Sequence, residues 1–244
     1  MINITYIGHS GFFLETETAC FLFDYYQGEI PSLNKDKPLV VFVSHGHADH
    51  YNPAIFELVY QYPSVQFILP KGTQIKKYVL KHEERGMNLS EHLLLVRKNE
   101  KYDIVLCNGK SLHLATLKST DLGVAYILDF EGKTYYHAGD LNLWLWDGES
   151  TEYNENMTRK YFTQLEKLRG KAIDIAFVPL DSRQGKYAFV GMESFLEYTD
   201  TKHVFPMHMW EKYDIITEFL KKHPEYDANM IKIKSQGQEM SILS

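Results

Sequence analysis

The stretch LVVFV at residues 39–43, followed by SHGHADH at residues 44–50, joins an apolar run to a dense cluster of polar side chains. The apolar run predicts a buried strand. The heptapeptide contains four side chains of the types that bind divalent metals. A rigid strand that ends in such a cluster predicts a metal site at its carboxyl end. The four side chains are His45, His47, Asp49 and His50.

The composition is that of a water-soluble globular protein. Of the 244 residues, 44% are hydrophobic and 24% are charged, which is ordinary for a globular chain and sufficient for a large core. We expect a single domain over residues 1–244. No run is long and apolar enough to span a membrane, and the first residues do not resemble a signal peptide. The two cysteines, Cys20 and Cys107, lie in strand-like runs and form no CxxC motif, so we expect core residues in a cytoplasmic protein.

The order of predicted elements favours an α/β fold. The first third is rich in strands, at 2–7, 11–16 and 20–24, and a β-meander follows between residues 102 and 138. Strands and helices then alternate, with helices expected at 155–169, 191–198 and 211–222. Two β-rich parts, each followed by strand–helix alternation, predict two packed sheets with helices outside.

The charge balance limits the partners. The net charge is −6, whereas a domain that grips a long nucleic acid usually carries a basic face. We therefore expect a small-molecule substrate, which can be anionic, and neither extended nucleic-acid binding nor membrane association. An oligomer is compatible with the sequence, which does not indicate its size.

Two distant segments offer further ligands. Residues 134–140, TYYHAGD, predict a strand and a tight turn before Asp140, and residues 204–208, VFPMH, predict a strand before His208. Each ligand would lie just beyond the end of a strand, as His45 does. A carboxylate such as Asp140 can bridge two cations.

These motifs, in this order, resemble the metallo-β-lactamase superfamily. Its HxHxDH signature is met at residues 45–50, its later aspartate in HAGD and its final histidine at His208. The opening TYIGHSGFFLE at 5–15 and FLFD at 21–24 are similar to L-ascorbate-6-phosphate lactonase and the N-acyl-phosphatidylethanolamine phospholipase D-like hydrolases. The resemblance implies an αββα sandwich of two mixed sheets with a dinuclear site that holds zinc, manganese or iron.

The resemblance also implies how the ligands are shared. His45 and His47 would serve a first metal, and Asp140 would bridge to a second. The second metal would be held by Asp49, His50 and His208.

One part of the family pattern is missing. A third histidine of the first site is expected at the end of a strand before the bridging aspartate, but here the strand leads into Ser119-Thr120-Asp121. Asp121 is the favoured substitute, because a carboxylate also binds such cations; a turn aspartate is the alternative. His137 is a second candidate substitute. The first site would then be weaker, empty, or selective for manganese or iron over zinc.

Other residues are candidates for catalysis. We expect Asp49 to orient or deprotonate a water nucleophile while it binds metal. His137 or His9 could protonate the leaving group; for His9, a structural role is the alternative.

The remaining candidates would support the site or contact the substrate. Asp24 could orient a ligating imidazole or serve as a turn residue. Asp181 and Arg183 could meet the substrate or form a surface ion pair. Trp144 could line the pocket or belong to the core.

Three functions compete. The first is a metal-dependent hydrolase in which one or two divalent ions, zinc before manganese or iron, lower the pKa of bound water; its substrates would be small esters such as phosphodiesters, lactones or phosphorylated sugars. The second is an iron-dependent oxidoreductase of the same fold, which the missing histidine favours. The third is a non-catalytic metal-binding protein whose first site has decayed.

Overall fold

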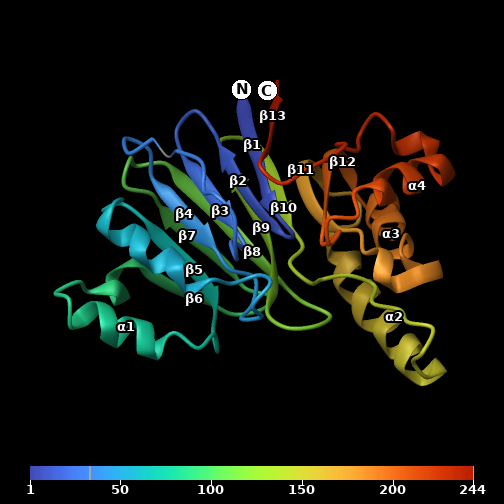
Figure 1. Cartoon of the computed structure of the whole chain (residues 1–244), viewed down its shortest axis with the longest axis horizontal. Coiled ribbons are helices and arrows are strands. Elements are labelled where there is room, and N and C mark those ends of the chain that lie inside the picture. The colour runs from blue at the N-terminus through green and yellow to red at the C-terminus, as the bar shows by residue number, and fades with distance from the viewer. Residues whose placement is uncertain (33, 244) are drawn as a thin grey trace.

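Two mixed β-sheets form the centre of the computed structural model, which describes residues 1–32 and 34–243 (Figure 1). One half of the first sheet pairs antiparallel and the other half parallel. In order across the first sheet, the strands are β13 (Gln238–Ile242), β1 (Ile2–Gly8), β2 (Gly11–Glu15), β3 (Cys20–Phe23), β4 (Leu39–Phe42), β5 (Gln66–Pro70) and β6 (Leu93–Val96).

The second sheet is also mixed. Its first three strands pair parallel and the others antiparallel. In order across the sheet they are β12 (Asp200–Met207), β11 (Ala172–Pro179), β10 (Lys133–His137), β9 (Val124–Phe130), β8 (Ser111–Lys118) and β7 (Lys101–Val105).

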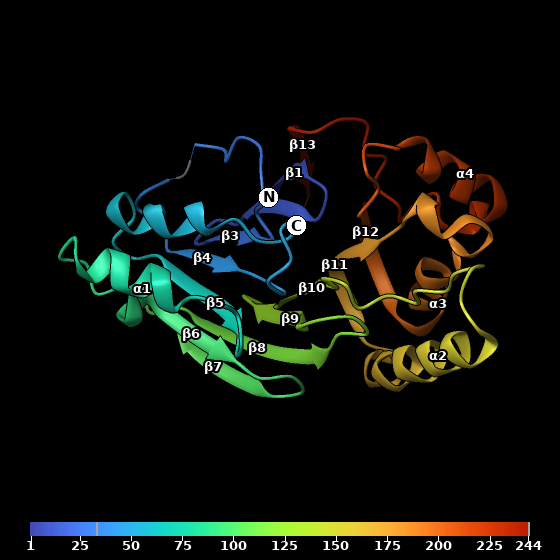
Figure 2. The same ribbon diagram turned by 60° about the horizontal axis from the view of Figure 1, so that its bottom comes forward.

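Helices flank the outer faces of the two sheets. Figure 2 shows α1 beside the first sheet and α2, α3 and α4 gathered near β11 and β12. This arrangement confirms the α/β prediction of two sheets with helices outside. The α-helices are α1 (Lys76–Glu83), α2 (Thr151–Leu165), α3 (Val190–Tyr198) and α4 (Asp214–Lys222), and the 3₁₀ helices are η1 (Pro53–Tyr60), η2 (Leu89–His92), η3 (Glu166–Leu168), η4 (Ser182–Tyr187) and η5 (Pro224–Tyr226).

Strand β4 shows how one apolar run serves two cores. Val40 and Phe42 pack into the core between the sheets, whereas Leu39 and Val41 pack beneath η1 and α1. All four side chains are buried. Alternate residues of a strand face opposite sides, so a strand covered on both faces needs an unbroken apolar sequence.

Several element boundaries differ from the expected ones. Helix α2 begins at Thr151 rather than at residue 155, because the Ser150 side chain accepts a hydrogen bond from Tyr153 N and caps the helix. Strand β6 was not predicted from the sequence. Cys20 is buried in β3 as expected, but Cys107 follows β7 and is exposed, so its assignment to the core was wrong. Within the described residues, no helix has the length and hydropathy to cross a membrane.

Candidate metal centre

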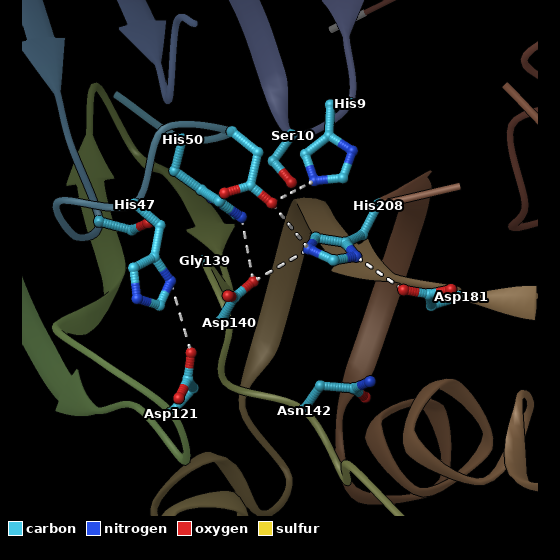
Figure 3. A network of polar contacts seen from close by, with 12 residues as sticks. His9, Ser10, His47, His50, Asp121, Gly139, Asp140, Asn142, Asp181 and His208 are labelled. Atoms are coloured by element: carbon cyan, nitrogen blue, oxygen red, sulfur yellow. Dashed lines mark hydrogen bonds and ion pairs between the residues drawn. The ribbon is translucent and has the colours of Figure 1, made fainter. Parts of the chain in front are cut away.

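The expected ligands lie at the carboxyl ends of strands. Strand β4 leads into residues 44–50, β10 into Asp140 and β12 into His208. Strands β1, β3 and β11 end in the same way before other polar residues, which are His9, Asp24 and Asp181. Contacts between these side chains bring six strand ends from distant parts of the chain to one site. Figure 3 shows His9, His50, Asp140, Asp181 and His208 close together there.

Four of these side chains form what we call the inner group: His9, Asp49, His50 and His208. One ligand atom of each lies within 4.8 Å of the others. His9 Nε2 lies 3.4 Å and His208 Nε2 4.0 Å from Asp49 Oδ2. Oδ1 of Asp140 lies 3.1 Å from His50 Nε2 and 3.4 Å from His208 Nε2. The inner group therefore surrounds a point that a cation could occupy.

The polar atoms that face this point have no hydrogen-bond partner. Nε2 of His9, His50 and His208 and Oδ1 of Asp140 are buried, and none forms a hydrogen bond within the described residues. Buried polar atoms are normally satisfied, so four that converge on one point require an explanation. This set of three imidazoles and two carboxylates, those of Asp49 and Asp140, is chemically suited to a divalent metal ion.

A second cluster, which we call the outer group, contains His45, His47, Asp121 and Asp140. His45 Nε2 lies 3.0 Å from His47 Nδ1 and 3.4 Å from Asp140 Oδ2. His47 Nδ1 lies 3.6 Å from Asp121 Oδ2. Asp121 thus lies beside the two histidines that lack a third, whereas His137 does not belong to this group.

Asp140 lies between the two groups. Its Oδ1 faces His50 and His208, and its Oδ2 faces His45. The backbone carbonyl of Asp140 accepts hydrogen bonds from Trp144 Nε1 (2.9 Å) and Thr120 Oγ1 (3.2 Å). These contacts hold the backbone at Asp140, whose two carboxylate oxygens face the two groups.

Two buried carboxylates orient the inner histidines from behind. Asp24 Oδ2 lies 2.7 Å from His50 Nδ1, and Asp181 Oδ2 lies 2.9 Å from His208 Nδ1. A proton held on each Nδ1 leaves Nε2 free to bind a metal, which is the usual arrangement behind ligating histidines. Asp24 also accepts hydrogen bonds from Ser44 N and Oγ, which ties the ligand loop to β3.

The electrostatics of the protein favour a cation at this position. Burial disfavours a charged His50, but the nearby carboxylates of Asp140 and Asp24 outweigh burial and raise the pKa of His50 to about 10. Burial opposes ionisation of Asp140 as well, yet His50 holds the pKa of Asp140 below its usual range. Burial lowers the pKa of His45 to about 4, which leaves its imidazole neutral and able to bind a metal.

Backbone strain is concentrated in the same place. His9, Asp24 and His208 have φ angles of 52°, 41° and 63°, a region that non-glycine residues seldom adopt. Each is the residue that directly follows a strand. Such conformations persist where the surrounding structure enforces them, and they are common at functional sites.

Two glycines allow the loops of the outer group to pack closely on Ser44. A Cβ at Gly123 (φ 73°) would lie 2.0 Å from the Ser44 carbonyl oxygen, and one at Gly139 (φ 51°) would lie 2.5 Å from Ser44 Cβ. Val124 N also donates to Ser44 O (3.0 Å). The loops that carry Asp121 and Asp140 are therefore held against the ligand loop.

The position of His137 contradicts its expected roles as proton donor and substitute ligand. The ring is fully buried and stacks on Phe23, with centroids 5.1 Å apart. Nε2 lies 3.0 Å from Ser10 O, and Nδ1 accepts from Gly139 N. Both ring nitrogens are thus occupied by backbone groups, so His137 has a structural position.

Asp181, Arg183 and Trp144 also differ from expected substrate contacts. Asp181 is fully buried against His208, and the Arg183 guanidinium binds its carboxylate and lies 4.4 Å from the Trp210 ring centroid. Hydrogen bonds from His208 and Arg183 outweigh burial and lower the pKa of Asp181 to about 2. Trp144 is buried and anchors Asp140. The ion pair between Asp181 and Arg183 and the core position of Trp144 were the alternatives to substrate contact that the sequence offered.

Two aromatic residues beside His9 were missed. The Trp210 ring lies 4.4 Å and the Tyr26 ring 5.9 Å from the His9 ring, centroid to centroid. Trp210 is 40% exposed, so it contributes to the surface beside the inner group. Its position two residues after His208, in MHMW, was the available signal.

Comparison with known proteins agrees with this arrangement. A UPF0173 metal-dependent hydrolase of Opitutus terrae is 28% identical over 149 residues, which cover 58% of this chain and 64% of that protein. The chain thus spans just under two thirds of that relative's length.

Solved structures share the fold at low identity. Igni18, a metallo hydrolase of Ignicoccus hospitalis, superposes with a TM-score of 0.62 at 17% identity, covering 98% of this chain and 97% of its own. CmlA, a diiron β-hydroxylase of Streptomyces venezuelae, also gives 0.62, at 12% identity over 99% of this chain and 54% of its own. These likenesses establish the fold.

The family assignment rests on the sequence itself. The family described as the Beta-lactamase superfamily domain matches residues 3–155, more than half of the chain. The matched segment includes the ligand loop, Asp121 and Asp140. With these ligands at the ends of strands in two packed sheets, the chain belongs to the β-lactamase superfamily.

Proposed function

We propose that this protein is a metal-dependent hydrolase. The observation that carries the proposal is the convergence of four buried, unpartnered polar atoms beside a second cluster that shares Asp140. Such a pair of clusters suits two divalent ions. The name of the Opitutus terrae relative supports the same activity.

The residues of the two groups would hold the metal ions at two neighbouring positions. Divalent ions would supply Lewis acidity that lowers the pKa of water and polarises the scissile group. His50 and His208, backed by Asp24 and Asp181, would hold one position, and His45, His47 and Asp121 the other, with Asp140 between them.

Proton transfer would fall to residues at the open side of the inner group. Asp49 is about one third exposed, at 30% of its side chain, and would orient the attacking water. The adjacent His9 imidazole lowers the pKa of Asp49, which keeps this carboxylate ionised. His9 Nε2, 3.4 Å away, would exchange a proton with Asp49 or with the leaving group.

We further propose a small ester as substrate, in the class of phosphodiesters, lactones and phosphorylated sugars. The net charge of −6 disfavours binding of a long nucleic acid. A cytoplasmic location remains a prediction, supported by the two unpaired cysteines.

The test is hydrolysis of a panel of phosphodiesters and lactones by purified protein loaded with zinc, manganese or iron. We expect His45→Ala to lower turnover at least about 100-fold, beyond the effect of a residue behind a ligand. His113→Gln is a matched control, because His113 is exposed and pairs with Asp103 away from the two groups. Full activity of His45→Ala would contradict the proposal.

The outer group favours one alternative. It offers two histidines and two carboxylates, a donor set that suits iron and manganese as well as zinc. An iron-dependent oxidoreductase is therefore the second candidate. Iron in the purified protein together with oxygen consumption would favour the oxidoreductase, and zinc with ester hydrolysis would exclude it.

A further inference from the structure

A cleft beside the outer group collects positive charge in an otherwise acidic protein. It has a volume of about 600 Å³ and is lined by Lys71, Arg97, Lys98 and Lys118. Asp121, a member of the outer group, lines the same cleft. The cleft thus opens directly beside the candidate metal position.

Strand ends from both sheets build this cleft. Lys71 follows β5, Arg97 and Lys98 follow β6, and Lys118 ends β8. Lys71 N donates to Val96 O (2.7 Å), so the first two segments are tied together. Because the backbone positions are fixed by strands, the four cationic side chains are held around one space although they are far apart in sequence.

The four cations outnumber the two carboxylates, Glu100 and Asp121, that line the same cleft. The ammonium groups of Lys71, Lys98 and Lys118 are exposed and form no ion pair with any described residue. Nη1 of Arg97 lies 4.0 Å from Glu100 Oε1, so this ion pair is at the limiting distance and weak. A metal ion bound to Asp121 would neutralise the negative charge of that carboxylate and leave the cleft more positive.

We propose that this cleft binds an anionic group, phosphate or carboxylate, on a small substrate whose scissile bond lies at the outer group. The inference rests on the proposed hydrolase and names its substrate class. A volume of about 600 Å³ suits a small molecule. Charges in a recessed surface focus the field and attract anions, and a guanidinium can hold a phosphate or carboxylate with two hydrogen bonds.

The cleft also offers an apolar contact. Leu122 lines it and is 50% exposed, next to the four cations. We therefore expect, within the proposed class, a substrate with an anionic end and a less polar body.

Binding of inorganic phosphate tests the cleft directly. Phosphate is titrated into the full-length protein, with and without zinc, and amide chemical shifts are followed by NMR. We expect shifts at residues 71, 96–98 and 118–123, and roughly 5- to 20-fold weaker binding in K98Q/K118Q. The control K76Q/K77Q removes the same charge from exposed lysines of α1 and should bind like the unmodified protein.

Kinetics test the link to the metal centre. K98Q/K118Q should raise KM for an anionic phosphodiester by a similar factor, leave its kcat unchanged and leave a neutral ester unaffected. If the protein hydrolyses neither ester, the hydrolase proposal is refuted. The proposal that the cleft binds anions is then decided by the phosphate titration alone.

Three outcomes would overturn the inference. The first is that phosphate changes the amide chemical shifts of residues elsewhere on the protein. The second is an equal loss of phosphate binding in K76Q/K77Q, and the third is undiminished phosphate binding in K98Q/K118Q. Much tighter, steeply salt-dependent binding of a short RNA oligonucleotide would also overturn it, in favour of a nucleic-acid surface.

Discussion

The inner and outer groups both contact Asp140, a member of the outer group, but they differ in how their ligands are supported. In the inner group, His50 and His208 are buried, and each is held from behind by a buried carboxylate. In the outer group, the side chains of His47 and Asp121 are 51% and 50% exposed. Neither is held from behind by a buried carboxylate, as His50 and His208 are.

This difference predicts two positions of unequal strength. A ligand fixed before the metal arrives loses little conformational freedom on binding, whereas an exposed side chain must be ordered. We therefore expect the inner group to bind the first metal tightly. The outer group should bind more weakly and respond more to the choice of metal.

The largest effect should come from the shared residue. Asp140→Asn keeps the side-chain volume but removes the charge that faces both groups, so both metals should be lost. Turnover should fall at least about 100-fold, and elemental analysis should find less metal at both positions. Retention of two metals per chain would show that Asp140 is not the bridge.

A smaller effect should follow from a change behind the inner group. Asp181→Asn weakens the contact that orients His208, and such changes typically cost about 10–100-fold in metal affinity. Metal titration should show the loss at the tighter site alone. An equal loss at both sites would mean that the two groups are not independent.

The smallest effect should come from the outer group. Asp121→Ala removes one exposed ligand, so the weaker site should lose roughly 10-fold in affinity while the tighter site is unchanged. The free energy of unfolding of the metal-free protein should change by no more than about 0.5 kcal/mol, because Asp121 is a surface residue. Unchanged affinity at the weaker site would remove Asp121 from the ligand set.

Much of the fold could be predicted from local pattern. The run 39–43 is apolar at every position because β4 is buried on both faces, and periodicity detects this directly. Strand β6 was missed because it is short and only partly buried. The start of α2 was missed because Ser150 caps a polar first turn that has little apolar periodicity.

The candidate site was predictable to a similar degree. Ligand types and their positions after strands indicated His45, His50, Asp140 and His208. Among the surrounding residues, Asp24 was expected either to orient a ligating imidazole or to be a turn residue, and it contacts His50; the role of His137 was not predictable. His137 resembles a ligand in HAGD, yet its ring packs in the core against Phe23, and only the packing of β3 on β10 decides this.

By itself the sequence determined the family, the ligand types and the departure at Asp121, because these depend on which residues occur and how they are spaced. Only the tertiary structure decided that Asp24 and Asp181 support the inner histidines and that two members of the outer group, His47 and Asp121, are exposed. It also gathered Lys71, Arg97, Lys98 and Lys118 around one cleft. The physical reason is that burial and electrostatic fields depend on distances between segments remote in sequence, which the pairing of strands and the packing of two sheets fix.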